Sequence, residues 1–163
     1  MAEQRERTTE WDALRDKYLQ PAAERPTSNA RGLHHFALIC TDVAATIDFY
    51  QGLLGFPLTE LFENRDYPGS THFFFDVGNG NLLAFFDFPD LGLGEYAEVL
   101  GGFHHLAISV APDKHAELRK TIEDAGVAID FDFETSIYLT GPDGERIELI
   151  ADSLGTMYGS DVS

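Results

Sequence analysis

The sequence is poor in cysteine, in long apolar runs and in cationic side chains. Its single cysteine, Cys40, has no second thiol with which to form an internal disulfide bond, and this usage suits an intracellular protein. No stretch is apolar and long enough to span a membrane, and the first residues are too polar for a secretory signal. We therefore expect a cytoplasmic protein with no membrane partner, folded as one compact domain or as two small halves that share a core.

Cationic side chains are both few and unevenly spread. The formal net charge is −17 at pH 7, which argues against nucleic acid as a partner because its phosphates would be repelled. Between Gly32 and Val110 the only cationic side chain is Arg65. A pocket built from this stretch has little with which to hold a carboxylate or phosphate, so we expect a largely apolar small-molecule ligand. The negative net charge would also be expected of a protein whose surface charge serves solubility, or of one adapted to acid or high salt.

The chain divides into an extension, two similar passages and a tail. In the extension Trp11, Leu14 and Tyr18 have helical spacing, and this apolar stripe would pack on the domain or on a second subunit. The predicted parts are an N-terminal helical extension with its linker (1–31), a first βαβββ module (32–88), a connector (89–101), a second βαβββ module (102–152) and a polar tail (153–163).

The two passages repeat one order of elements. The stretch GLHHFAL at 32–38 returns as GFHHLAI at 102–108. Each copy is followed by an amphipathic helix and then by three strands, the last two of which form a hairpin. Two such half-domains can pair their sheets and leave a cleft between them, which predicts an α+β fold.

The paired histidines are the first candidates for chemistry. Because strand side chains alternate between the two faces of a sheet, His35 shares its face with Ala37 and Ile39. The repeat gives His105 the same orientation. Their neighbours, His34 and His104, would point to the other face and serve packing or solvent.

A carboxylate in the middle of a strand is the second candidate. Aligned on their turns, the final hairpins make Glu148 equivalent to Ala84. An unpaired buried charge is costly, so Glu148 needs a partner. His35, His105 and Glu148 would converge on one cavity as a facial set for a divalent metal with open positions. In the alternative reading the histidines are ordinary strand residues, and Glu148 pairs with Arg146 or faces solvent.

Two segments, HFALICTDVAATIDFYQGLLGF (35–56) and GPDGERIEL (141–149), resemble the vicinal oxygen chelate superfamily. That group includes glyoxalase I, extradiol dioxygenases, fosfomycin-resistance transferases and metal-free bleomycin-resistance proteins. The resemblance covers residues 32 to 152 and implies two βαβββ modules that form an open, cupped mixed sheet around a cleft. It also implies metal ligands from the first and last strands of each module: His35, Ala84, His105 and Glu148. Because Ala84 cannot be a ligand, the pattern is similar to the three-ligand members.

The resemblance also suggests catalytic and substrate-binding residues. Extradiol dioxygenases place a tyrosine ten residues before the metal-binding Glu, where this chain has Tyr138. Their histidine upstream of that tyrosine is missing here, so His72 is the remaining candidate acid or base; as a plain strand residue it would lie near the rim. Another histidine, His115, is expected at the surface. The side chains expected to line the cavity are Phe74, Phe86, Phe88 and Tyr138.

Three functions remain open at this point. The first is a non-haem enzyme of extradiol-dioxygenase type, with Fe²⁺ favoured and a catechol-like, vicinal-oxygen substrate. The second is a glyoxalase-like isomerase or lyase that uses Zn²⁺, Ni²⁺, Co²⁺ or Mn²⁺ as a Lewis acid. The third is a metal-free binding protein of the bleomycin-resistance type. Dimers are common in the superfamily, so we also expect a homodimer by analogy.

Overall fold

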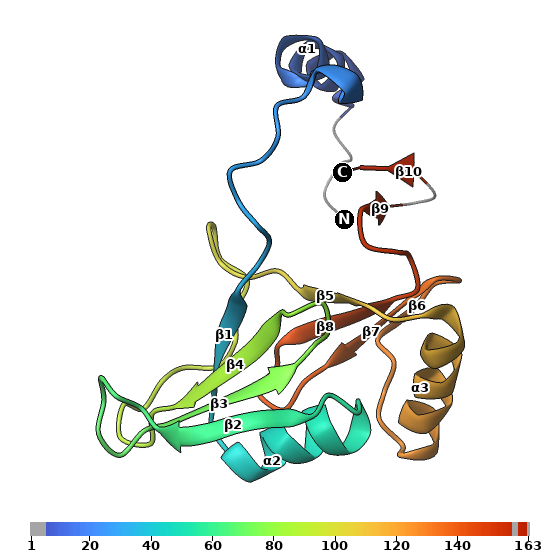
Figure 1. Ribbon diagram of the computed structural model, residues 1–163. Helices are drawn as coiled ribbons and strands as arrows, with labels where there is room; N and C mark the ends of the chain where they lie inside the picture. Colours follow the sequence, from blue (N-terminus) through green and yellow to red (C-terminus); the bar gives the residue numbers. More distant parts are fainter. Residues whose placement is uncertain (1–5, 158–159, 163) are drawn as a thin grey trace. The chain divides into compact units, whose positions relative to one another are not determined.

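The computed structural model describes residues 6–157 and 160–162 (Figure 1). The chain separates into two compact units, Met1–Gly32 and Leu33–Ser163. None of the described helices is long and apolar enough to cross a membrane.

The first unit is helical. It contains α1 (Thr8–Tyr18) and a single 3-10 turn, η1 (Ala22–Glu24). The helix forms where the spacing of Trp11, Leu14 and Tyr18 predicts it, and none of its residues is buried.

The second unit contains two modules with the same order of elements. The first module consists of β1 (His35–Cys40), α2 (Val43–Ile47) with its π-helical continuation η2 (Asp48–Leu53), β2 (Leu58–Glu63), β3 (Thr71–Asp76) and β4 (Leu82–Asp87). The second module consists of β5 (Leu106–Ser109), α3 (Pro112–Asp124), β6 (Phe131–Asp132), β7 (Ser136–Thr140) and β8 (Arg146–Ile150). The tail adds two short antiparallel strands, β9 (Thr156–Met157) and β10 (Ser160–Asp161).

Each module forms one open, mixed sheet of four strands. The strand orders are β1-β4-β3-β2 and β5-β8-β7-β6. In both sheets the first strand is an edge strand that runs parallel to the last one, while the remaining pairs are antiparallel. The predicted α+β fold with two βαβββ modules is therefore confirmed. The first strand after the helix is short in the second module, where only Phe131–Asp132 form a ladder with β7.

A side-chain cap and a glycine determine where the helical segment of the first module begins and ends. The Asp42 side chain accepts a hydrogen bond from the Ala45 backbone N–H at 3.0 Å and so caps α2. Gly55 has a φ of +72°, the left-handed conformation that ends a helix at low cost only in glycine. Between these ends lies Tyr50, which is fully buried. Its ring packs against the rings of Phe75 and Phe85.

The two modules share one buried core. Its members come from the helices and from the sheet faces beneath them; the largest are Tyr50, Phe73, Phe75, Phe85, Leu83, Ile122, Ile137, Leu139, Ile147 and Leu149. Because strand side chains alternate, the residues between these positions lie on the opposite face of each sheet. The predicted site residues His35, Phe74, Tyr138 and Glu148 all belong to those opposite faces.

The turn between β7 and β8 joins the second module to the first. Its Glu145 carboxylate is buried and accepts a hydrogen bond from the Tyr50 hydroxyl at 2.7 Å. The Asp143 carboxylate accepts hydrogen bonds from the backbone N–H and the hydroxyl of Thr41. Burial raises the pKa of Glu145 above its usual value, so the hydroxyl and the Asp143 backbone N–H offset part of the cost of burying this charge.

We predict that Tyr50→Phe destabilises the second unit. The substitution removes one of the donors to the buried Glu145 carboxylate, which costs about 1–3 kcal/mol when a buried group loses its partner. Urea denaturation measures the change in the free energy of unfolding, with Tyr18→Phe as the control because Tyr18 is 66% exposed. Equal midpoints for Tyr50→Phe and the wild type would show that this bond does not hold the modules together.

Candidate metal centre

The second module brings two of the predicted ligands into contact. His105 Nε2 lies 3.0 Å from Glu148 Oε2. Glu148 is on β8 and only 6% exposed, and its other oxygen accepts a hydrogen bond from the Ser136 hydroxyl on β7. A buried carboxylate is stable only when its oxygens are satisfied, and here an imidazole and a hydroxyl satisfy them. One imidazole and one carboxylate fit a divalent metal as donors.

Glu148 does not take the alternative partner that the sequence allowed. Arg146 instead pairs with Glu98 of the connector, with Nη1 2.9 Å from Oε1. The expectation of a Glu148–Arg146 pair, or of a solvent-facing Glu148, is therefore wrong. The carboxylate faces His105 because β5 lies directly beside β8, with Ala107 opposite Glu148.

Tyr138 lies on the same face as this pair. It is half-buried on β7, directly opposite Glu148 in the strand register. Its ring centroid is 5.6 Å from that of His105, and Phe131 and Phe133 flank it at 6.1 Å each. Both phenylalanines are exposed. The functional face of the second module is thus apolar, with the His105–Glu148 pair and Tyr138 in its middle.

The first module carries a second functional face with different chemistry. His35 is exposed on edge strand β1, and its ring centroid lies 6.4 Å from that of Phe74. Ala84 is fully buried between Ala37 and Phe74 in the register, so this position offers no metal-binding atom.

An aromatic row extends from His72 along this face. The His72 ring stacks on Phe86 at 3.9 Å, Phe86 stacks on Phe88 at 5.9 Å, and Tyr67 closes the row against Phe88. His72 Nε2 is enclosed and has no hydrogen-bond partner among the described residues. Burial, and then the nearby His35, lower the pKa of His72. Both effects disfavour the protonated form of the ring.

The structure does not bring all three predicted ligands together. Within residues 6–157 and 160–162, no group of three His, Cys, Asp or Glu side chains is placed to hold a metal ion. His105 and Glu148 lie in contact in the second module, whereas His35 lies on the functional face of the first module. The three-ligand set thus stays a prediction for this chain.

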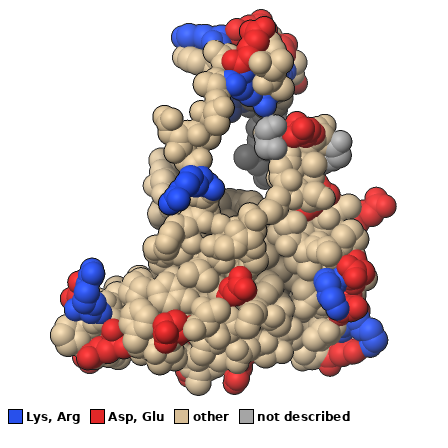
Figure 2. Space-filling view, in the orientation of Figure 1, with Lys and Arg blue, Asp and Glu red and all other residues tan. Residues whose placement is uncertain are grey.

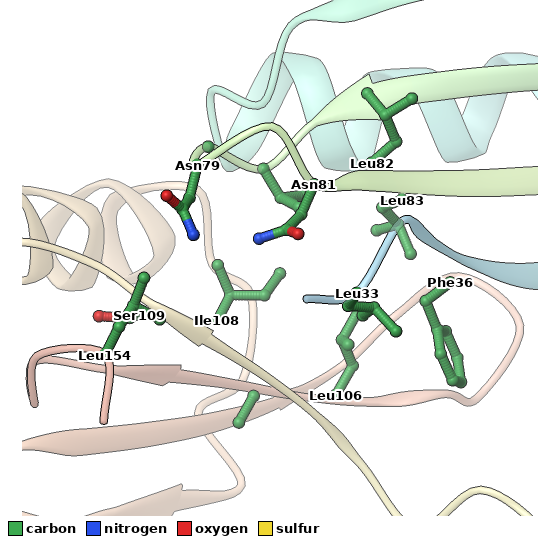
Figure 3. A pocket seen from close by; sticks show the side chains of 13 residues that line it. Leu33, Phe36, Asn79, Asn81, Leu82, Leu83, Leu106, Ile108, Ser109 and Leu154 are labelled. Atoms are coloured by element: carbon green, nitrogen blue, oxygen red, sulfur yellow. The ribbon is translucent and has the colours of Figure 1, made fainter. Parts of the chain in front are cut away.

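Two hollows lie elsewhere in the second unit. One is a largely apolar pocket of about 230 Å³. Asn79 and Asn81 point toward Ile108 in it (Figure 3). A larger cleft of about 870 Å³ runs along β1 beside the connector and the β7–β8 turn. Neither hollow is lined by any of the predicted site residues.

The sequence reasoning placed His115 wrongly and did not identify Tyr67. His115 was expected at the surface but is buried, with Nε2 3.1 Å from the Leu149 carbonyl oxygen. Its spacing from Leu118 and Ile122 on α3 was an available signal, because those residues face the core. Tyr67 carried no such signal, since it lies in a loop between β2 and β3.

The chain matches a known family over most of its length. Residues 32–149 match the model of the Glyoxalase/Bleomycin resistance protein/Dioxygenase superfamily. Among curated proteins, it is 28% identical over 102 residues to "Putative ring-cleaving dioxygenase MhqE" of Bacillus subtilis (strain 168). That alignment covers 61% of this chain but 33% of the relative, so the chain spans about a third of the relative's length.

Solved structures share the fold. A variant of the fosfomycin resistance protein FosX from Listeria monocytogenes, in complex with Mn(II) and 1S,2S-dihydroxypropylphosphonic acid, superposes with a TM-score of 0.60 at 22% identity, over 77% of this chain and 95% of that one. A glyoxalase/dioxygenase from Nostoc punctiforme superposes with a TM-score of 0.61 at 24% identity, over 77% and 93%. At these identities the likeness extends to the fold alone.

We predict that Ser136→Ala weakens metal binding about 10–100-fold, because groups that orient a ligand contribute on this scale. Glu148→Ala removes the predicted ligand itself and should abolish binding. Calorimetric titration with Zn²⁺ measures both effects, and Glu123→Ala, an exposed carboxylate on α3, is the control. Unchanged Zn²⁺ affinity in Glu148→Ala would exclude Glu148 as a ligand.

Proposed function

Because the chain belongs to the Glyoxalase/Bleomycin resistance protein/Dioxygenase superfamily, we propose that it is a metal-dependent, extradiol-type dioxygenase. Its substrate would be a largely apolar molecule with two vicinal oxygens, such as a catechol. The observation that carries the proposal is the buried His105–Glu148 pair beside Tyr138. A structural role alone would not require a charged side chain in the middle of this apolar face.

His35, His105 and Glu148 would hold the metal, and Fe²⁺ is the favoured ion. Two histidines and one carboxylate are the donor set typical of non-haem Fe(II) oxygenases. When bound, the ion would supply Lewis acidity and the electron transfer that dioxygen chemistry needs. Glu148 needs no rearrangement for this role, since its oxygens already face His105 and Ser136.

We propose that a second copy of the chain completes the site. His35 lies apart from the other two ligands, and the shared core occupies the opposite faces of both sheets. The functional faces expose the large apolar side chains of Ile39, Phe62, Phe131 and Phe133. A homodimer that joins the first module of one copy to the second module of the other would cover these side chains and bring the three ligands together.

The substrate would lie between the two joined faces. Phe74, Phe86 and Phe88 offer flat apolar contacts from the first module, and Tyr138 offers a hydroxyl from the second. Three arginines of the two modules already have carboxylate partners: Arg65 with Asp66, Arg119 with Asp132 and Arg146 with Glu98. Most of the surface in view in Figure 2 is uncharged or acidic. These features favour a substrate without a carboxylate or phosphate.

We predict oxygen consumption by the Fe²⁺-loaded protein with a catechol. The protein would be loaded without oxygen and tested on a panel of substituted catechols in an oxygen electrode. Tyr138→Phe should lower kcat/KM about tenfold, the effect of one lost hydrogen bond of roughly 1.4 kcal/mol.

Other results would point to other functions. Oxygen-independent turnover with Zn²⁺, Ni²⁺, Co²⁺ or Mn²⁺ would identify a glyoxalase-like isomerase or lyase instead. A protein that binds an apolar molecule and stays inert with every metal would be a binding protein. No oxygen uptake with any catechol at full iron occupancy would refute the dioxygenase.

A further inference from the structure

A small pocket lies apart from the candidate metal centre, between the two modules. It is bounded on one side by the turn between β3 and β4 and on the other by edge strand β5, and all of its lining residues belong to the second unit. Its volume is about 230 Å³, whereas a protein cavity of roughly 150 Å³ is enough to bind benzene. The pocket therefore has room for a single ring with a small substituent, or for a short chain of similar size.

The wall of this pocket is apolar and uncharged. Its apolar side chains include Leu33, Phe36, Leu82, Leu106, Ile108 and Leu154. Leu33 and Leu154 are 57% and 68% exposed, so a bound molecule would remove apolar surface from water. None of the described residues that line the pocket is Asp, Glu, Lys, Arg or His. Because an ion buried without a partner is costly, the pocket favours a neutral molecule.

Two side-chain amides give the pocket a polar end. Asn79 and Asn81 extend from the β3–β4 turn toward Ile108 on β5 (Figure 3). Neither amide has a hydrogen-bond partner among the residues that the structure describes, and each offers two N–H donors and one carbonyl acceptor. The one other polar side chain of the wall, the Ser109 hydroxyl, is already used, because it donates to the Asp152 carbonyl oxygen at 2.7 Å.

The turn itself requires only one of these asparagines. Asn79 has a φ of +52°, a left-handed conformation that asparagine adopts more readily than most residues. Asn81 does not have a positive φ, and its backbone is paired with Gly78 at 2.9 Å and with Val77 at 3.2 Å. The backbone therefore gives no reason for an amide side chain at position 81, whereas a polar group bound in the pocket does.

We propose that this pocket is a further small-molecule site, which binds a neutral molecule with one ring or a short chain and one hydroxyl or carbonyl group. The Asn79 and Asn81 amides bind the polar group, and Leu33, Leu106 and Leu154 cover the apolar part. A ligand that displaces water from an amide must replace its hydrogen bond, so a purely apolar molecule binds less well. The site is independent of the proposed metal centre, because none of the predicted metal ligands lines it.

Three probes of similar size test the chemistry of the pocket. Benzyl alcohol has a ring and a hydroxyl, toluene has the ring alone, and benzoate has a ring and a charge. Titration of the nitrogen-15-labelled full chain in NMR measures each affinity and locates each probe. We expect benzyl alcohol to shift the amide signals of Asn81, Leu82 and Ile108, and to bind about 2–10-fold more tightly than toluene, the effect of one net hydrogen bond. Benzoate should give no saturable shifts at these residues.

Two substitutions test the amides separately. Asn81→Leu removes one amide at nearly constant size, and we expect it to lower the affinity for benzyl alcohol to that for toluene. Asn79→Gly removes the other amide and keeps a residue suited to a positive φ, so it should weaken benzyl alcohol binding without disturbing the turn. Asn29→Leu, at an exposed position outside the second unit, is the control and should change neither affinity.

Several results would overturn the proposal. One is equal affinity of the wild type, Asn81→Leu and Asn79→Gly for benzyl alcohol, and another is equal affinity of the wild type for benzyl alcohol and benzoate. Shifts confined to Phe74 and Tyr138 would place the probe at the functional faces instead. Signals of Ile108 that move with protein concentration alone would show that a second copy covers the pocket. A chain that binds no metal would leave this site intact, so the two proposals fail separately.

Discussion

The buried carboxylate of Glu148 is the constraint on which the candidate site depends. Burying a charge in a strand is tolerated only when hydrogen-bonding groups surround it. Ser136 supplies such a group from β7, and His105 supplies one from the position directly before β5. The strand order β5-β8-β7 is what makes both approach at once, because it places β8 between them. The fold therefore holds an imidazole and a carboxylate in contact before any ligand arrives.

The packing of the shared core determines which face of each sheet stays accessible to a ligand. Residues from the helices and the sheet faces beneath them fill one cluster, and the β7–β8 turn fastens the modules through Tyr50–Glu145 and Thr41–Asp143. This packing uses one face of each sheet and leaves the other face of each available. Ile39 and Phe133 remain exposed there. A second copy is the partner that would cover such faces and add His35 to the pair.

Sequence periodicity predicted the modules well, because the repeat and the strand–helix order depend on local patterns. Glu148 was also predictable, since a carboxylate in an apolar strand is itself a signal. Alternation also placed His105 on the side of Glu148, which it contacts, although β5 itself begins only at Leu106. The contact between Tyr50 and Glu145 joins residues 95 positions apart, and no local pattern specifies how two modules dock.

A metal centre built from two chains predicts that two inactive variants complement each other. His35→Ala and Glu148→Ala chains with different affinity tags would be co-expressed, and the mixed dimer isolated for metal analysis. Each variant alone should fail to retain metal. In the mixed dimer one of the two sites keeps all its ligands, so bound metal should return at one ion per dimer. A mixed dimer as empty as its parents would exclude a metal centre shared between two chains.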